Sequence, residues 1–346
     1  MTDTAADELK AISWSELKTY QRCPKQHEYK YVDRLVPVKK SRPLFLGSWV
    51  HSALESYYTG GDWKIGHQPY LELYNQLFEE ERTELDKRGK LPDIVTRILQ
   101  SYMFYYKDDG WKVHAIEQHF EVETPLKING KVQTFQGIID LVVEDEEGRR
   151  WVVDHKTAGT IPEPTAFHAM DPQLMLYPWA AKEAWGWDIA GIIYNYVKSK
   201  APSIPKLNKD GSLSKRKVAT DYPTLYRFFR QNGYDPNEFA DILRPLRRRS
   251  PFLRRYRLPR EGHVTKEILL DSLATAKRIR TPHRRVRTIT RDCSTMCSYH
   301  DLCRADLNGF DTTRMRLDQF TPKEERTFGD RTDDEYTDER EEESDE

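Results

Sequence analysis

The chain has 346 residues, which is enough for one large domain or two smaller ones. Hydrophobic residues make up 38% of it and aromatic residues 12%, so it can bury a sizeable core, while 32% of its residues are charged. It contains no uncharged apolar run of about 18 residues that would predict a membrane span. The first ten residues lack the basic start and apolar stretch of a secretory signal. We therefore expect a cytoplasmic protein, encoded by a bacterial cell or a virus.

Charge is distributed unevenly along the chain. Residues 244–291 contain 16 Lys and Arg against 3 Asp and Glu, whereas residues 321–346 contain 13 Asp and Glu against 4 Lys and Arg. Two long blocks of opposite sign favour a polyanion-binding surface followed by an acidic tail. Phe252, Tyr256 and the arginines of the basic block could line a groove for a single strand, through phosphate contacts and base stacking. A solvated helix surface is the competing interpretation.

The first part of the chain is predicted to be helical. Ser13 and Glu16 have the spacing of a capping box, and the amphipathic helix that follows runs to about Val32, interrupted at Cys23-Pro24. Apolar residues at helical spacing predict three further helices, over 47–58, 69–88 and 91–108.

The pattern then changes from helical to strand periodicity. Alternating apolar residues predict strands at 113–123, 132–143 and 150–156, with a hairpin turn at Asn129-Gly130. A helix over 171–185 and a strand over 189–197 follow. This β-β-β-α-β order indicates an α/β fold with a mixed sheet flanked by helices. Helices are also predicted at about 237–249 and 265–279.

These elements suggest six regions. They are a flexible N-terminus at 1–10, an N-terminal helical segment at 11–110, a core at 111–200, a mobile loop at 201–222, a basic helical segment at 223–318 and an acidic disordered tail at 319–346.

Two aspartates and a lysine are expected to meet on neighbouring strands. Asp140 ends a Gly-x-x-Asp motif in one strand, and Asp154 and Lys156 form an Asp-x-Lys motif at the end of the next. Residues two apart in a strand share a face, so Asp154 and Lys156 point the same way. Close carboxylates repel one another unless a cation such as Mg²⁺ or Mn²⁺ lies between them. The alternative is a pair of ordinary strand-end charges with a lysine partner, because Asp-x-Lys is common by chance.

Three further polar residues strengthen the first interpretation by their order in the chain. His51 lies in a predicted helix with apolar neighbours, where a lone histidine is more often a satisfied core residue. Gln173 and Tyr177 lie on one face of the helix that follows the third strand, so they can look onto the same site.

The only four cysteines are Cys23, Cys293, Cys297 and Cys303. A reducing compartment and the clustering of the last three argue for a metal site rather than two disulfides. Thiolates suit an iron–sulfur cluster or zinc. Zinc stays open, because His27 and His300 could complete a mixed site.

The series of motifs resembles the RecB-like PD-(D/E)XK nucleases that carry an iron–sulfur cluster. This family includes CRISPR-associated RecB-like exonucleases, the AddB nuclease domain and a mitochondrial single-strand exonuclease. The resemblance covers about residues 11–305 and rests on S-W-S-x-L-x-x-Y-x-x-C-P, G-x-x-x-H, G-x-x-D, D-x-K, Q-x-x-x-Y and the terminal cysteines, in that order. It implies a restriction-endonuclease-like core whose helical N- and C-terminal segments are joined by a metal cluster.

The resemblance also implies roles for particular residues. His51, Asp140 and Asp154 would ligate Mg²⁺ or Mn²⁺, and Lys156 would be the catalytic lysine. Gln173 and Tyr177 would contact DNA and support the site, and Glu117 matches a further acidic position. The four cysteines would hold a structural [4Fe–4S] cluster.

Two departures from the family pattern concern the metal sites. Three residues separate Cys293 from Cys297, where the family usually has two, which affects the expected cluster type. The carboxylate of the D-x-K motif is Asp154, where some branches have Glu, and either can ligate a metal.

Three hypotheses follow from these motifs. The leading one is a metal-dependent DNA exonuclease acting on single-stranded or free ends, in recombination, repair or replication. The second is a catalytically silent DNA-binding module, and the third is a nuclease that trims DNA ends for CRISPR-type spacer acquisition. The chain has no Walker A motif, so a helicase or recombination protein would act as a separate partner.

Overall fold

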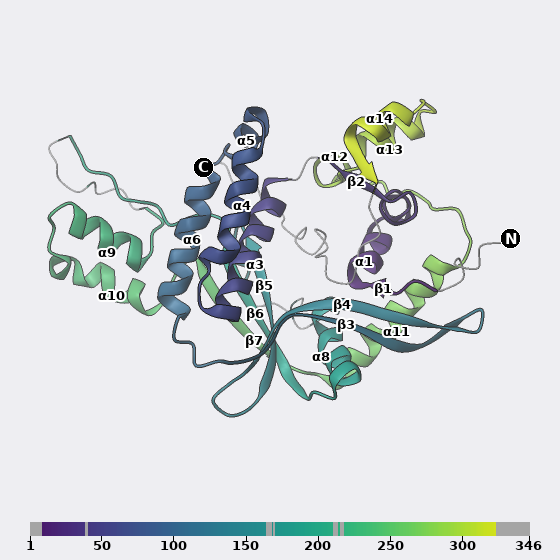
Figure 1. The fold of residues 1–346 in the computed structure, drawn as a ribbon, viewed down its shortest axis with the longest axis horizontal. Coiled ribbons are helices and arrows are strands. Elements are labelled where there is room, and N and C mark those ends of the chain that lie inside the picture. The colour runs from purple at the N-terminus through teal and green to yellow at the C-terminus, as the bar shows by residue number, and fades with distance from the viewer. Residues whose placement is uncertain are drawn as a thin grey trace.

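A mixed six-stranded sheet forms the centre of the protein, as a computed structural model of the chain describes it (Figure 1). The structure describes residues 9–38, 41–163, 168, 170–209, 214 and 218–322. Parts of the regions expected to be flexible, mobile or disordered lie outside these residues, namely 1–8, 210–213, 215–217 and 323–346.

The longest strands pair as the sequence predicts. β3 (Lys112–Ile128) and β4 (Lys131–Glu144) form an antiparallel hairpin around the Asn129-Gly130 turn, where both residues have positive φ. β5 (Arg150–Ala158) lies antiparallel to β4 and parallel to β6 (Ile189–Lys198). The parallel pair is joined through α8 (Pro172–Trp185), as a β-α-β crossover requires.

Two short strands lie near the ends of this sheet. β1 (Ile12–Ser13) pairs in parallel with β4, and β7 (Leu253–Pro259) pairs antiparallel to β6. The sequence analysis expects a basic helical segment with a cysteine cluster at 223–318 and does not predict β7. Its strand geometry comes from pairing with β6, which the arginine-rich sequence of this segment does not indicate.

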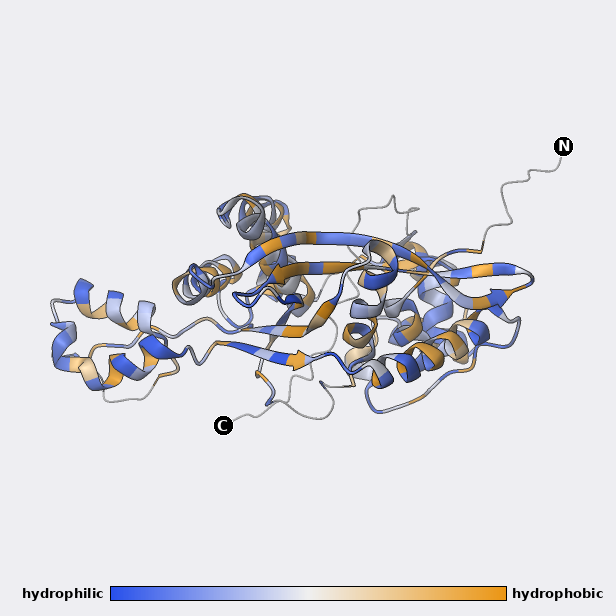
Figure 2. Ribbon diagram, turned by 90° about the horizontal axis from the view of Figure 1, so that it is seen from below, coloured by the Kyte–Doolittle hydropathy of each residue, from blue (hydrophilic) through white to orange (hydrophobic). Residues whose placement is uncertain are grey.

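Helices cover both faces of the sheet (Figures 1 and 2). α8 and α11 (Gly262–Arg280) bury apolar residues such as Leu174, Met175 and Ile279 against one face. α3 (Arg42–Gly60) lies on the other face, beside α6 (Leu91–Tyr106), and these two helices form a second core around Trp49 and Leu99. Among the described residues, no helix is long and apolar enough to cross a bilayer.

The N-terminal helices differ in detail from the prediction. α1 (Trp14–Arg22) is capped by Ser13 and ends at Cys23, after which Pro24 starts α2 (Pro24–His27) and a π-helical turn, η1 (Glu28–Val32). The single helix expected over 69–88 is two helices, α4 (Lys64–Gln76) and α5 (Glu79–Leu85). Extended backbone at Leu77 and Phe78 separates them, and Glu81 caps the second through the Phe78 backbone N–H.

A small helical lobe, residues 222–249, interrupts the chain between β6 and β7. It contains α9 (Tyr222–Gln231), which the sequence interpretation missed, a 3₁₀ turn η2 (Pro236–Phe239) and α10 (Ala240–Arg248). These helices bury Leu225, Phe228, Phe229 and Leu243 in a core of their own. Figure 1 shows the lobe standing away from the sheet.

The two ends of the described chain pack together. β2 (Leu35–Pro37) pairs with β8 (Phe320–Pro322), and this corrects the expected onset of disorder at 319. α12 (Cys293–Met296), α13 (His300–Leu307) and α14 (Thr313–Gln319) lie between α11 and β8. Tyr29 stacks on Tyr299 and donates a hydrogen bond to Asp306, in a cluster that also buries Leu302 and Phe320.

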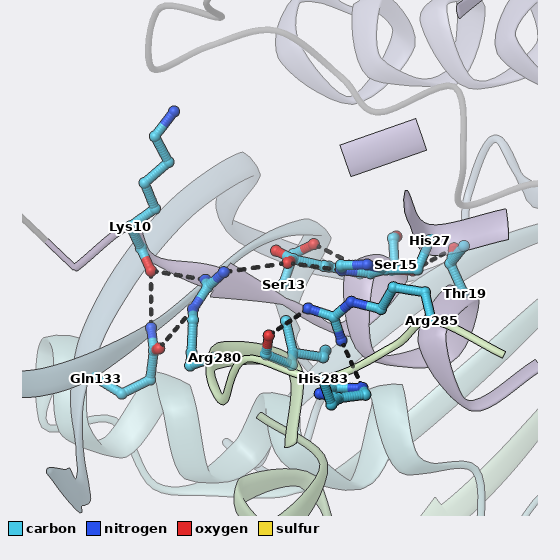
Figure 3. Close-up of polar contacts among 11 residues, drawn as sticks. Lys10, Ser13, Ser15, Thr19, His27, Gln133, Arg280, His283 and Arg285 are labelled. Atoms are coloured by element: carbon cyan, nitrogen blue, oxygen red, sulfur yellow. Dashed lines mark hydrogen bonds and ion pairs between the residues drawn. The ribbon is translucent and has the colours of Figure 1, made fainter. Parts of the chain in front are cut away.

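A half-buried arginine also attaches the N-terminal segment to α11 and β4. The Arg280 side chain donates hydrogen bonds to Gln133 Oε1 and to the Lys10 carbonyl, and lies 3.4 Å from Glu16 Oε1 (Figure 3). Glu16 in turn contacts His27 Nε2 at 3.1 Å. This contact engages Nε2 of the buried His27, whose Nδ1 makes no hydrogen bond with the described residues.

Candidate active site

Asp140 lies where β5 separates from β4. The β4–β5 pairing runs from Glu144 opposite Arg150 to Leu141 opposite Val153. One step further along, the His155 backbone N–H donates to Asp140 Oδ2 at 2.8 Å instead. The carboxylate of Asp140 is therefore held by the backbone of the neighbouring Asp-x-Lys motif.

The glycine of the Gly-x-x-Asp motif has a packing role. Gly137 lies opposite Phe120 on β3, and a Cβ added at this glycine would lie 2.7 Å from the Phe120 ring. The Phe120 ring thus covers the β4 backbone at Gly137, three residues before Asp140.

His51 reaches this point from α3 on the other side of the sheet. Its side chain is 2% exposed, and its Nε2 donates to the His155 carbonyl at 2.7 Å. With the proton on Nε2, Nδ1 keeps its lone pair and lies 3.5 Å from Asp140 Oδ2. The imidazole and the carboxylate therefore converge on one location.

Glu117 completes this group. It lies on β3 between Ile116 and Gln118, which pair with Leu141 and Ile139, so it faces Asp140 across the hairpin. Ligand atoms of His51, Glu117 and Asp140 all lie within 4.8 Å of one another. Carboxylate oxygens with one imidazole nitrogen form a donor set that suits Mn²⁺ or Mg²⁺.

The backbone of Glu117 is strained. Its φ of +46° lies in the left-handed region, which costs a non-glycine residue roughly 1–2 kcal/mol. Strain of this kind persists where the surrounding structure imposes it, and it often accompanies function. Here the strained backbone directs the Glu117 carboxylate toward that of Asp140. The two carboxylates would repel each other in the absence of a cation.

A pair of substitutions at Glu117 separates strain from function. Glu117→Gly is expected to raise the free energy of unfolding of the metal-free protein by about 1 kcal/mol, since glycine accepts positive φ, and to weaken Mn²⁺ binding. Glu117→Gln keeps the strained backbone and removes only the repulsion with Asp140, so it should weaken Mn²⁺ binding with a smaller gain than Glu117→Gly. Urea unfolding and Mn²⁺ titration measure the two effects. A destabilised Glu117→Gly that binds Mn²⁺ normally would contradict this interpretation.

Asp154 and Lys156 lie together on β5, as the two-residue spacing predicts. Lys156 Nζ is 3.1 Å from Asp154 Oδ2, and the carboxylate is 4% exposed. Burial raises the pKa of Asp154 above its usual range, the charges of Asp140 and Asp171 act in the same direction, and the ammonium of Lys156 opposes them. Asp154 therefore lies near the other carboxylates. The set of three residues whose ligand atoms lie within 4.8 Å of one another contains Glu117 and not Asp154.

Gln173 and Tyr177 lie on the first turns of α8. Asp171 caps this helix through the Gln173 backbone N–H, and Gln173 Nε2 donates to the Tyr177 hydroxyl at 2.8 Å. Both side chains are buried, and the Tyr177 ring meets Phe120 edge to face. The predicted pairing at i, i+4 is confirmed, and contact with a nucleic acid stays a prediction.

All four cysteines lie within the described residues, and none forms a disulfide. The Thr288 backbone N–H donates to Cys23 Sγ at 3.4 Å, and Cys293 Sγ lies 3.8 Å from the Thr288 carbonyl oxygen. Burial raises the pKa of the Cys297 thiol, and the nearby Cys23 and Cys293 raise it further. Cys297 and Cys303 both pack against the Tyr29–Tyr299 cluster. The fold thus gathers a cysteine from α1 with three from the C-terminal segment.

Basic side chains surround this cysteine group. Arg22 binds the Met296 carbonyl oxygen, and Arg287 interacts with Cys303 and lies 2.6 Å from Asp306. Positive charge and N–H donors favour thiolates. A metal cluster at these cysteines stays a prediction.

The basic block has a more mixed role than its sequence indicates. Arg255, Arg280 and Arg287 make buried or half-buried contacts inside the protein. Phe252 is 3% exposed, so the expectation that it stacks on bases is wrong. Tyr256 donates to the Pro162 carbonyl. Several arginines that the sequence analysis assigned to a surface therefore make contacts within the folded protein.

Comparison with known proteins identifies the family of this chain. The family described as the PD-(D/E)XK nuclease superfamily matches residues 11–304, which is most of the chain. The chain therefore belongs to the PD-(D/E)XK nuclease superfamily, and the predicted fold class is confirmed. No curated protein matches the chain by sequence.

Two solved structures are similar to the chain over most of its length. One is the crystal structure of a protein designated SSO0001, with a TM-score of 0.35 and 14% identity, covering 87% of this chain and 89% of that chain. The other is a protein of Eubacterium rectale described as a candidate exonuclease, with a TM-score of 0.41 and 13% identity, covering 81% and 85%.

The sequence interpretation missed three residues near the site. Asp171 caps α8 and adds negative charge beside Asp154. Asn195 is fully buried on β6, and Arg255 lies beside it on β7. Asn195 offered a signal, because it is the one amide within the apolar and aromatic run of residues 189–197. Arg255 offered none, since it stands among many other arginines.

Proposed function

We propose that this protein is a RecB-like, Mg²⁺- or Mn²⁺-dependent deoxyribonuclease that degrades DNA from its ends, with single strands as the preferred substrate. The observation that carries the proposal is the convergence of His51, Glu117 and Asp140 beside the Asp154–Lys156 pair. Membership of a nuclease superfamily supports the reaction class.

Each side chain would have a distinct role in phosphodiester hydrolysis. His51, Glu117 and Asp140 would hold the cation, with Asp154 as a further oxygen ligand. When bound, the cation supplies Lewis acidity at the phosphate and lowers the pKa of water. Lys156 would orient the attacking water and offset the negative charge that develops on the phosphate. Gln173 and Tyr177 would hold the DNA strand against this edge of the sheet.

The four cysteines would ligate a [4Fe–4S] cluster that joins the N-terminal helices to the C-terminal segment. Zinc held by these cysteines with His27 or His300 is the alternative, because each imidazole has a second nitrogen besides the one that contacts a carboxylate. A brown colour that bleaches in air, with bound iron and without stoichiometric zinc, would support the cluster.

The helical lobe, residues 222–249, offers a surface for the DNA backbone. It carries exposed arginines at positions 227, 230, 244, 247, 248 and 249, against acidic residues at 235, 238 and 241. Part of the predicted polyanion-binding function of the basic block, residues 244–291, would therefore belong to this lobe. The lobe adds the arginines of α9, which precede that block.

Replacing three lobe arginines tests this surface. A variant with Arg247, Arg248 and Arg249 changed to Gln should bind a labelled single strand roughly tenfold more weakly at low salt. Its dependence of log affinity on log salt should flatten by about 2, as expected when three phosphate contacts are lost. A matched variant with Lys87, Arg88 and Lys90 changed to Gln should bind normally. Equal losses in both variants would contradict a specific role of the lobe.

End-labelled digestion tests the proposed activity. Single-stranded DNA labelled at each end in turn should shorten progressively with Mn²⁺ and stay intact with chelator. Internal fragments of fixed length would instead indicate endonuclease action. Intact DNA under all conditions, with binding retained, would favour the catalytically silent DNA-binding module.

The pathway would be recombination, repair or replication, with a helicase or recombination protein as partner. Trimming of DNA ends for CRISPR-type spacer acquisition is the alternative pathway for the same reaction. Co-purification with a helicase, or with a spacer-integrating protein, would distinguish the two.

A further inference from the structure

A row of three polar side chains crosses the sheet beside the proposed metal site, on the face that α3 and α6 cover. Arg255 on β7 lies directly opposite Asn195 on β6, and Asn195 lies directly opposite His155 on β5. Residues in register on adjacent strands point to the same face of a sheet. Hydrogen bonds connect the row, from Arg255 Nε to Asn195 Oδ1 at 3.2 Å and between Asn195 Nδ2 and His155 Nδ1 at 2.6 Å.

Aromatic residues from α3, α6 and the segment just before β3 enclose this row. The Arg255 guanidinium lies 3.6 Å from the Tyr106 ring centroid and 3.8 Å from that of Trp111. It also donates to the hydroxyls of Tyr58 and Tyr102. The Tyr58 ring stacks on His155, with centroids 5.9 Å apart.

The charge of this enclosed arginine is balanced locally. Arg255 Nη2 lies 3.1 Å from Asp109 Oδ2, and both side chains are 14% exposed. A buried ion pair that is also fully hydrogen-bonded fixes geometry more than it adds stability. The row is therefore suited to hold its far end, His155, in one position.

His155 is the middle residue of the Asp-x-Lys motif, and its backbone holds two of the proposed ligands. Its N–H donates to Asp140, and its carbonyl accepts from His51. Its side chain points away from the Asp154–Lys156 face, toward Asn195. Its ring accepts a hydrogen bond from Asn195, stacks on Tyr58 and meets the His51 ring edge to face, which restricts rotation of the peptide groups on either side.

We infer that the row Arg255–Asn195–His155 positions the metal ligands from the face of the sheet that α3 and α6 cover, where the His51 ring meets that of His155. His155, Asn195 and Arg255 are thus positioning residues, which touch neither substrate nor cation. The inference rests on the proposed metal site, and outer partners of this kind typically change metal affinity by roughly 10–100-fold.

Direct Mn²⁺ binding tests the row without relying on cleavage. Chelator-treated and desalted protein would be titrated with Mn²⁺ by calorimetry or by electron paramagnetic resonance of the free ion. Asn195→Ala and His155→Leu should each weaken Mn²⁺ binding at least tenfold. His155→Asn, whose side-chain oxygen can accept the same hydrogen bond, should retain affinity within about threefold.

Two reference variants complete the experiment. Asp140→Ala should abolish binding to the site. Tyr105→Phe removes a hydrogen bond of α6 that leads away from the row, to the Leu246 carbonyl, and should leave Mn²⁺ affinity unchanged. Thermal unfolding of each variant shows whether it is folded.

The outcomes separate the inference from the proposed function. Wild-type affinity in Asn195→Ala and His155→Leu would overturn the inference and leave the proposed nuclease intact. Affinity losses that follow the fall in unfolding temperature across all variants, His155→Asn included, would also overturn it. If the wild type bound no Mn²⁺, or bound it equally with Asp140→Ala, the proposed metal site itself would fail.

Discussion

Asp154→Ala is expected to abolish cleavage of end-labelled DNA while DNA binding largely survives. The substitution removes a buried carboxylate 3.1 Å from Lys156 and next to Asp140, so it takes away a proposed ligand and the ion-pair partner of the Lys156 ammonium. Loss of one preorganised charged group at a reacting centre typically costs 10²–10³-fold in rate, and loss of a metal ligand adds to this. We therefore expect a decrease of at least about 10³-fold.

A matched aspartate provides the control for this prediction. Asp188 is exposed and pairs with Lys182 on the surface, so Asp188→Ala should cleave at the wild-type rate. Gel-shift measurements with chelator present report DNA binding for both variants. Loss of binding in a folded Asp154→Ala, or cleavage that continues, would contradict the role assigned to Asp154.

Cys297→Ser is expected to release bound iron and to destabilise the protein by several kcal/mol. Cys23 and Cys293 are 270 residues apart, so a cluster that joins them restricts a very long loop in the unfolded chain. A covalent crosslink closing a loop of about 100 residues contributes roughly 5 kcal/mol in the chain-entropy estimate. The loss should appear first in the Tyr29–Tyr299 cluster, which contacts Cys297 and Cys303.

Iron analysis and thermal unfolding of the whole protein measure both effects. Ser294→Ala, a substitution in the same turn that removes no thiol, is the control and should keep iron and stability. Wild-type iron content and unfolding temperature in Cys297→Ser would contradict a ligand role. Stoichiometric zinc in the wild type would show that the cysteines hold zinc and not an iron–sulfur cluster. The structural role of the cysteines would stand.

The sequence predicts the central sheet well, because its strands alternate in polarity and the Asn129-Gly130 turn is specific. It does not predict β7, since charge normally marks a surface helix or loop, and Arg255 becomes a strand residue only through Asp109 and the aromatic side chains around it. The same limit explains Phe252, whose burial depends on α3 and α6 packing over it.

The candidate site is predictable in its parts and less so in its grouping. Motif order brings together His51, Asp140, Asp154 and Lys156. The central position of Glu117 depends on a left-handed residue within β3, which no periodicity reveals. The supporting row depends on strand register across β5, β6 and β7, which is a property of the folded sheet.

Anomalous scattering from crystals grown with Mn²⁺ tests the central claim most directly. The account predicts one strong peak at about 2.1 Å from side-chain atoms of His51, Glu117 and Asp140, which is lost in Asp140→Ala crystals. A peak located elsewhere, or these three side chains unchanged with no peak at saturating Mn²⁺, would contradict it.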